Sequence, residues 1–140
     1  MRYWLIALAC LAAASPAVAQ EFKGPAAGKW RSIIDGDTSQ PNDQCIEKQE
    51  SLADFLDGDD MIDVGITCAD FKFRREGRKI IGTYICTDKE NGVTMTSSVT
   101  LTGDMSSKYT SEIVTRFSPP PAPGYETVTM KASSTRIGGC

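Results

Sequence analysis

Apolar and polar residues alternate along most of the second half of the chain. Ala69, Phe71 and Phe73 are separated by charged residues, and the same period of two returns in the later segments. A period of two places successive side chains on opposite faces of a β-strand. The pattern predicts strands over residues 68–74, 79–86, 93–102, 109–117 and 125–136.

Shorter elements are predicted before Cys68. Residues 28–34 alternate and form the expected first strand, and residues 44–48 form a second one. Residues 51–56 predict a helix of one or two turns, because Ser51 can cap it and Gly58 can end it.

Consecutive strands joined by short turns form an antiparallel meander. Asn91-Gly92 predicts a type I′ hairpin turn, which needs positive φ at both central residues. We therefore expect a mainly β fold of six or seven strands, as a strongly curved sheet or partly closed barrel with a short helix over one opening. A two-layer β-sandwich is the alternative.

The first nineteen residues have the organisation of a cleavable secretory signal. Arg2 precedes an apolar run over residues 3–14, and Ala17-Val18-Ala19 fits the small-x-small pattern of a cleavage site. We expect residues 1–19 to be a signal peptide, residues 20–27 a flexible lead-in and residues 28–140 a single disulfide-linked domain. An uncleaved anchor is the alternative, but the apolar run is short for a membrane span.

Four cysteines remain after the leader, which would remove Cys10: Cys45, Cys68, Cys86 and Cys140. An even count in an exported chain favours disulfides, and four cysteines allow three pairings. A zinc site is disfavoured because no two cysteines have the spacing of zinc ligands.

The hairpin around Gly77 bears on the disulfide pairing. A three-residue turn over residues 76–78 sets Cys68 opposite Cys86, within disulfide range. A two-residue turn is expected to set Ile85 there instead, and the pairing would then need a bulge. We favour Cys68–Cys86, which leaves Cys45–Cys140.

Composition excludes several classes of chemistry. The chain has no histidine, so Ser-His-Asp and Cys-His catalysis and the usual zinc sites are excluded. The net charge is −3, and loss of Arg2 makes it more negative, so we expect no nucleic-acid partner. We predict no catalytic residue, no metal and no cofactor.

Four features remain as candidate contacts. An acidic segment could hold calcium, although a solvated turn is the favoured interpretation. Its acidic residues are Asp54, Asp57, Asp59, Asp60 and Asp63. The Thr/Ser row over residues 94–102 could be a surface for sugars or simply the wet face of a strand, and the prolines at 119–123 form a stiff loop. The candidate ligand or surface contacts are Trp30, Tyr84, Tyr109 and Tyr125.

Several framework features occur together in this chain. Gly28-Lys29-Trp30 opens a strand, Cys45 precedes the short helix, Cys68 and Cys86 lie about a hairpin apart, and residues 136–140 read basic-x-Gly-x-Cys. In these features the chain resembles the bacterial domain-of-unknown-function family 3617. It departs from that pattern at Lys29, at residues 46–48 and at Gly139. The resemblance implies a small exported domain in a Gram-negative periplasm, and it implies no activity.

These observations favour a non-enzymatic binding or envelope-associated module in the periplasm or outside the cell. Its expected partner is an envelope component or a small apolar ligand, without stable membrane insertion after the signal is cleaved. The alternatives are a protein-interaction or inhibitor module and, less favoured, a carboxylate-based hydrolase.

Overall fold

A computed structural model describes residues 21–58 and 65–140 as one open antiparallel sheet with a short helix. The seven strands have the spatial order β2-β1-β7-β6-β5-β4-β3. Their bounds are β1 Gly28–Ile34, β2 Asn42–Ile46, β3 Ile66–Glu76, β4 Lys79–Asp88, β5 Val93–Gly103, β6 Lys108–Ser118 and β7 Thr127–Gly138. This is the predicted mainly β fold, and because all strands share one sheet the sandwich alternative is set aside.

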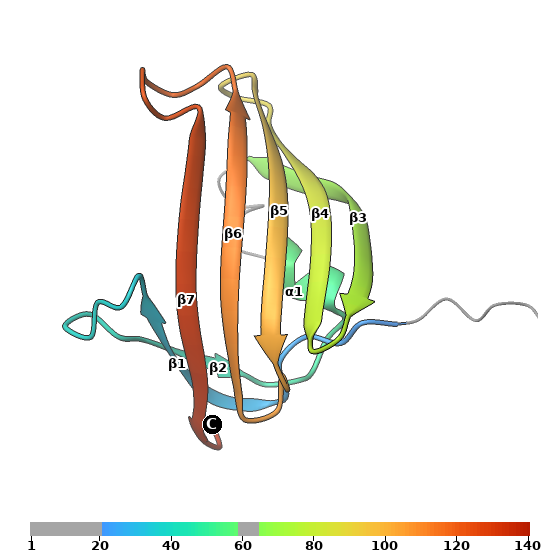
Figure 1. The fold of residues 1–140 in the computed structure, drawn as a ribbon, viewed down its shortest axis with the longest axis vertical. Coiled ribbons are helices and arrows are strands. Elements are labelled where there is room, and N and C mark those ends of the chain that lie inside the picture. Colours follow the sequence, from blue (N-terminus) through green and yellow to red (C-terminus); the bar gives the residue numbers. More distant parts are fainter. Residues whose placement is uncertain (1–20, 59–64) are drawn as a thin grey trace, which may run out of the picture.

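Strands adjacent in sequence also pair in space, except β2 and β3. The sheet is open between these two strands, and helix α1 (Leu52–Asp57) connects them. Figure 1 shows β1 and β2 crossing the lower end of the other strands at a steep angle, with α1 behind β4 and β5. Within the described ranges, no helix is both long enough and apolar enough to cross a membrane.

Helix α1 is short and capped at both ends, as predicted. The Ser51 hydroxyl accepts a hydrogen bond from the Asp54 backbone N–H at 3.1 Å. Gly58 ends the helix with φ of 55°, a backbone conformation that suits glycine. Leu52 is fully buried and attaches the helix to the core. Three of the five predicted acidic candidates, Asp59, Asp60 and Asp63, lie outside the described residues.

The core lies on one side of the sheet, which we call the inner face. On β4 the residues Ile80, Tyr84 and Cys86 point into it, and on β5 Val99 and Leu101 do so. Trp30 of β1 and Leu52 of α1 complete the buried cluster, together with Met105 and Tyr109. The residues that alternate with them point to the opposite, outer face: Ile81, Thr83 and Ile85 on β4 and Thr100 on β5. The alternation in the sequence predicts the two faces of β5, whereas β4 has apolar residues on both sides and its sequence pattern leaves the inward face open.

The β3–β4 hairpin has the shorter of the two turns considered, together with a bulge. Glu76 pairs with Lys79, which leaves a two-residue turn, and an uninterrupted register would place Thr87, not the predicted Ile85, opposite Cys68. One extra residue on β3 between Ala69 and Lys72 shifts the register, and Asp70 there has a φ of 58°. This β-bulge places Cys68 opposite Cys86.

Two cysteine pairs lie at disulfide distance, and they are the two favoured pairs. Cys68 and Cys86 join neighbouring strands, with Cα atoms 4.0 Å apart. Cys45 and Cys140 have Cα atoms 5.7 Å apart and are separated by 95 residues in sequence. The second pair ties edge strand β2 to the last residue of the chain.

We expect the paired variant Cys45→Ala/Cys140→Ala to lose about 4–5 kcal/mol of unfolding free energy, because it releases a long loop in the unfolded chain. Urea denaturation followed by Trp30 fluorescence measures this, since Trp30 is the one tryptophan after the predicted leader. Alkylation and mass spectrometry of the oxidised protein without residues 1–19, which contain Cys10, should find no free thiol. A variant as stable as the parent, or free thiols in the parent, would contradict the pairing.

Gly82 on β4 is required by packing rather than by its backbone angle. A Cβ at this position would collide with the ring of Phe73 and lie 3.1 Å from Val99 Cγ1. The Phe73 ring has little room to move, because Phe22 and Phe71 pack against it with ring centroids 5.7 and 6.2 Å away.

Gly82→Ala should therefore destabilise the domain by about 1–3 kcal/mol, the usual cost of overpacking. Gly139→Ala is the matched control, because a Cβ there meets no atom within 4 Å. Equal denaturation midpoints for the two variants would contradict this prediction and show that the Phe73 ring can move aside at no cost in stability.

Candidate binding surfaces

The predicted aromatic contacts occupy different environments. Trp30, Tyr84 and Tyr109 are buried in the core, whereas Tyr125 is 58% exposed in the β6–β7 connection. The Trp30 and Tyr109 rings lie 5.4 Å apart, and Trp30 Nε1 donates a 2.8 Å hydrogen bond to the Ala26 carbonyl. The structure therefore brings Trp30 and Tyr109 together as packing residues and leaves Tyr125 apart from them.

The two buried tyrosines are poor candidates for acid–base chemistry at neutral pH. Burial raises the pKa of Tyr84, and a hydrogen bond with Ser97 opposes that shift. Burial likewise raises the pKa of Tyr109, opposed by Ser134. Both phenols therefore stay protonated near pH 7 and act as packed, hydrogen-bonded groups.

The inner face remains apolar beyond the buried core. Ile113 of β6 pairs with buried Val99 on one side and with Met130 of β7 on the other, so all three share this face. Exposure rises along this row, from 0% at Val99 to 40% at Met130. Ile34 and Val128, on the same face, are 42% and 38% exposed. We call Ile34, Ile113, Val128 and Met130 the apolar strip.

The sequence pattern indicated part of this strip. Alternation placed Val128, Met130 and Ala132 on one side of the last strand. Alternation could not show that α1 leaves these residues uncovered, because the position of α1 depends on where the sheet opens. Exposed apolar side chains in line with a core are a recognised signal of a binding surface.

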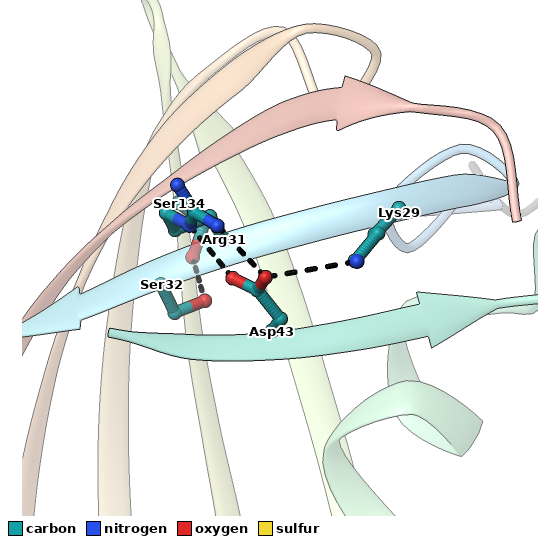
Figure 2. A network of polar contacts seen from close by, with 5 residues as sticks. All are labelled: Lys29, Arg31, Ser32, Asp43 and Ser134. Atoms are coloured by element: carbon teal, nitrogen blue, oxygen red, sulfur yellow. Dashed lines mark hydrogen bonds and ion pairs between the residues drawn. The ribbon is translucent and has the colours of Figure 1, made fainter. Parts of the chain in front are cut away.

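A polar network fastens the β1–β2 edge (Figure 2). The Arg31 guanidinium donates two hydrogen bonds to Asp43, at 2.7 and 2.9 Å, and Lys29 Nζ lies 3.8 Å from the same carboxylate. The hydrogen bond from Arg31 lowers the pKa of Asp43. The Ser32 and Ser134 hydroxyls, 2.7 Å apart, connect β1 to β7. The Lys29–Arg31–Asp43 group is exposed whereas Ser134 is buried, and the direct role of both sets of contacts is to hold strands together.

Carboxylates gather beside α1, where a hollow of about 720 Å³ lies against β2. Glu47, Glu50, Asp54 and Asp57 line it. Asp54 is occupied in capping, because its carboxylate accepts the Ser51 hydroxyl at 2.6 Å. Within residues 21–58 and 65–140, no three potential ligating side chains are placed to hold a metal ion.

The carboxyl pKa shifts in the described regions do not favour general-acid chemistry, because a carboxylic acid needs a raised pKa to donate a proton near neutral pH. The shifts are all downward, because hydrogen bonds stabilise the ionised form. They occur at Asp37, Asp43, Asp88 and Asp104. Four carboxylates do share one hollow, which is the feature that a carboxylate-based hydrolase would use.

The proline segment connects β6 to β7 as an exposed loop. The Tyr125 backbone N–H donates to the Ala122 carbonyl at 3.1 Å, and the Phe117 N–H donates to the Glu126 carbonyl at 3.0 Å. These bonds hold the loop closed on itself and present the Tyr125 ring to solvent.

Comparison with known proteins gives a family and no relative of known activity. No curated protein and no solved structure matches the chain. A family model described as a protein of unknown function (DUF3617) matches residues 25–140, which include every strand and the helix. The chain therefore belongs to the DUF3617 family.

Proposed function

We propose that this protein is an exported, non-enzymatic binding domain whose inner face takes a small apolar ligand in the periplasm or outside the cell. Export is supported by the signal-like pattern over residues 1–19 and by two cysteine pairs at disulfide distance. An envelope component with an acyl chain is a ligand of this kind.

The observation that carries the proposal is the exposure of Val128 and Met130 in line with the core. Their cross-strand partners on β6 are Thr115 and Ile113, which are half-buried. Transfer of apolar surface from water contributes roughly 25 cal/mol per Å², so a ligand lying along β7 gains from side chains that the fold leaves wet.

The shape of the strip favours a chain-like ligand over a folded protein. The strip crosses strands β6, β7 and β1 as a narrow continuation of a buried row. Stable protein–protein interfaces usually need about 800 Å² on each partner, with many residues. A single acyl chain needs only a narrow apolar channel.

Met130→Glu should weaken binding of a dansyl-labelled fatty acid about tenfold or more, because the ligand would have to desolvate a carboxylate. Thr129→Glu is the matched control, since Thr129 is the next residue on β7 and points to the outer face. Fluorescence titration gives both affinities. Equal weakening in the two variants would point to charge repulsion, and no binding to the parent would exclude this ligand class.

Sedimentation of the parent tests the competing occupant of the strip. A concentration-dependent dimer that Met130→Glu abolishes would assign the strip to a second copy of the chain, against the ligand proposal. A monomer at all concentrations, with binding of the fatty-acid probe, supports it.

The second candidate is a protein-interaction or inhibitor module that uses the β6–β7 loop. Its support is the exposed Tyr125 ring on a loop stiffened by four prolines between residues 119 and 123. Rigid exposed aromatics are typical anchors of protein interfaces.

If the loop binds a protein partner, a photo-crosslinker at position 122 should capture one defined species from an envelope extract, and Tyr125→Ser should reduce its yield several-fold. Tyr125→Phe, which retains the ring, should preserve it. Equal yields from all three proteins would exclude Tyr125 as an anchor.

A further inference from the structure

A second concavity lies on the outer face, on the opposite side of the sheet from the apolar strip. It has a volume of about 710 Å³ and extends from β4 to the loop after β1. Thr100, Thr102, Thr110 and Ser133 form its floor, on strands β5, β6 and β7. We call it the outer hollow. Its volume is within the range of ordinary ligand sites.

The hollow is a local feature and does not extend over the whole face. On β5 the outward residues Thr94, Thr96 and Ser98 are exposed, whereas Thr100 and Thr102 are half-buried although they point the same way. The surface therefore changes from open to recessed along a single strand.

The loop after β1 supplies one side of the hollow, and hydrogen bonds fix its position. The Asp35 backbone N–H donates to the Lys131 carbonyl at 2.7 Å, and the Lys131 N–H donates to Asp35 Oδ1 at 3.0 Å. Asp35 has a φ of 50°, which turns the chain at this point. The wall is therefore held in place without a ligand.

Hydroxyl groups on the floor are available to a ligand. In the portion of the chain that is described, no side-chain hydrogen bond occupies the hydroxyls of Thr100, Thr102, Thr110 or Ser133. On the inner face, by contrast, Ser97 bonds to Thr115 and Ser32 bonds to Ser134. A free hydroxyl donates and accepts, so the floor matches a ligand that also does both.

The charges around the hollow balance. Lys131 Nζ lies 3.4 Å from Glu112 Oε2, and the other charged residues that line the hollow are Lys79 and Asp35. Two positive and two negative groups give no net attraction for an anion or a cation. Ile33 adds an apolar contact beside the hydroxyls.

We propose that the outer hollow binds a neutral oligosaccharide. Such a ligand has donor and acceptor hydroxyls, C–H faces for Ile33 and no net charge, and these properties match the lining. The lining contains no aromatic ring for a sugar to stack on, so the expected affinity is weak, on the order of millimolar. This site is separate from the apolar strip, and the proposal for it does not depend on the proposal for the strip.

Titration of ¹⁵N-labelled mature protein with maltotriose and with chitotriose tests the proposal by NMR. We expect at least one of the two sugars to shift the amide signals of Thr100, Thr102, Thr110 and Ser133 in a saturable way. Trigalacturonic acid, an anionic trisaccharide, should bind no better than the neutral sugars.

Thr100→Val and Thr102→Val each remove one hydroxyl at nearly constant volume and should weaken binding about three- to tenfold, the usual effect of one lost hydrogen bond. Thr96→Val is the matched control on the same strand and face, and it should leave the affinity unchanged. The fatty-acid probe of the inner face should bind all three variants like the parent.

Three results would overturn the proposal: no saturable shifts with either neutral sugar, shifts spread equally over residues 94–98, or a clear preference for the anionic trisaccharide. A variant whose amide spectrum loses its dispersion is replaced by the other threonine variant, and the parent titration alone remains decisive.

Discussion

Strand β1 pairs with β2 on one side and with β7 on the other, so the first and last strands of the domain are neighbours. All other neighbouring strands are joined by hairpins and can pair locally. The β1–β7 contact closes the longest loop of the fold and carries the largest entropic cost. Trp30, the Ser32–Ser134 hydrogen bond and the Cys45–Cys140 pair all act at or beside this junction. Trp30 of β1 enters the hydrophobic core at this junction.

The position of the opening follows from the same pairing. Because β1 takes the free edge of β7, β2 and β3 become the two edges of the sheet, and α1 connects them. A helix of six residues covers only part of the inner face. Its fully buried residue, Leu52, belongs to the cluster formed by β4 and β5, whereas Val128 and Met130 on β7 remain exposed. The apolar strip is thus exposed because the helix is too short to cover the whole width of the sheet.

Much of the fold could be predicted from the sequence because the strands alternate so regularly. The β1 bounds, the capped helix and the inward residues of β5 all follow from period and capping chemistry, whereas β4 is apolar on both faces and its inward side does not. The turns were less predictable. Asn91-Gly92 does not form the predicted type I′ turn, because Asp88 Oδ1 accepts from the N–H groups of Glu90 and Asn91 and builds a longer loop.

The β3–β4 turn shows the same limit. Its register depends on a bulge at Asp70, and nothing in the local pattern of residues marks that bulge. The two surfaces were still less accessible to sequence reasoning. The exposure of Met130 and the recess at Thr102 depend on which distant segments cover a face, and alternation describes only the strand itself.

Hydroxyls within the inner face explain how an alternating sheet keeps one register. Tyr84, Ser97 and Thr115 are cross-strand partners in one row, and Tyr109, Ser134 and Ser32 form a second row. Ser97 and Ser134 are 4% and 3% exposed, so an unpaired hydroxyl at either place would be costly.

Each buried serine instead bonds to a hydroxyl of the next strand, Thr115 or Ser32, at 3.0 or 2.7 Å. A slip of one residue would break both rows and turn apolar side chains outward. The polar rows therefore specify the alignment of β4 to β6 and of β6 to β1, while the apolar residues around them supply most of the stability. That division explains why serines occupy two buried positions of a sheet whose core is otherwise mostly apolar.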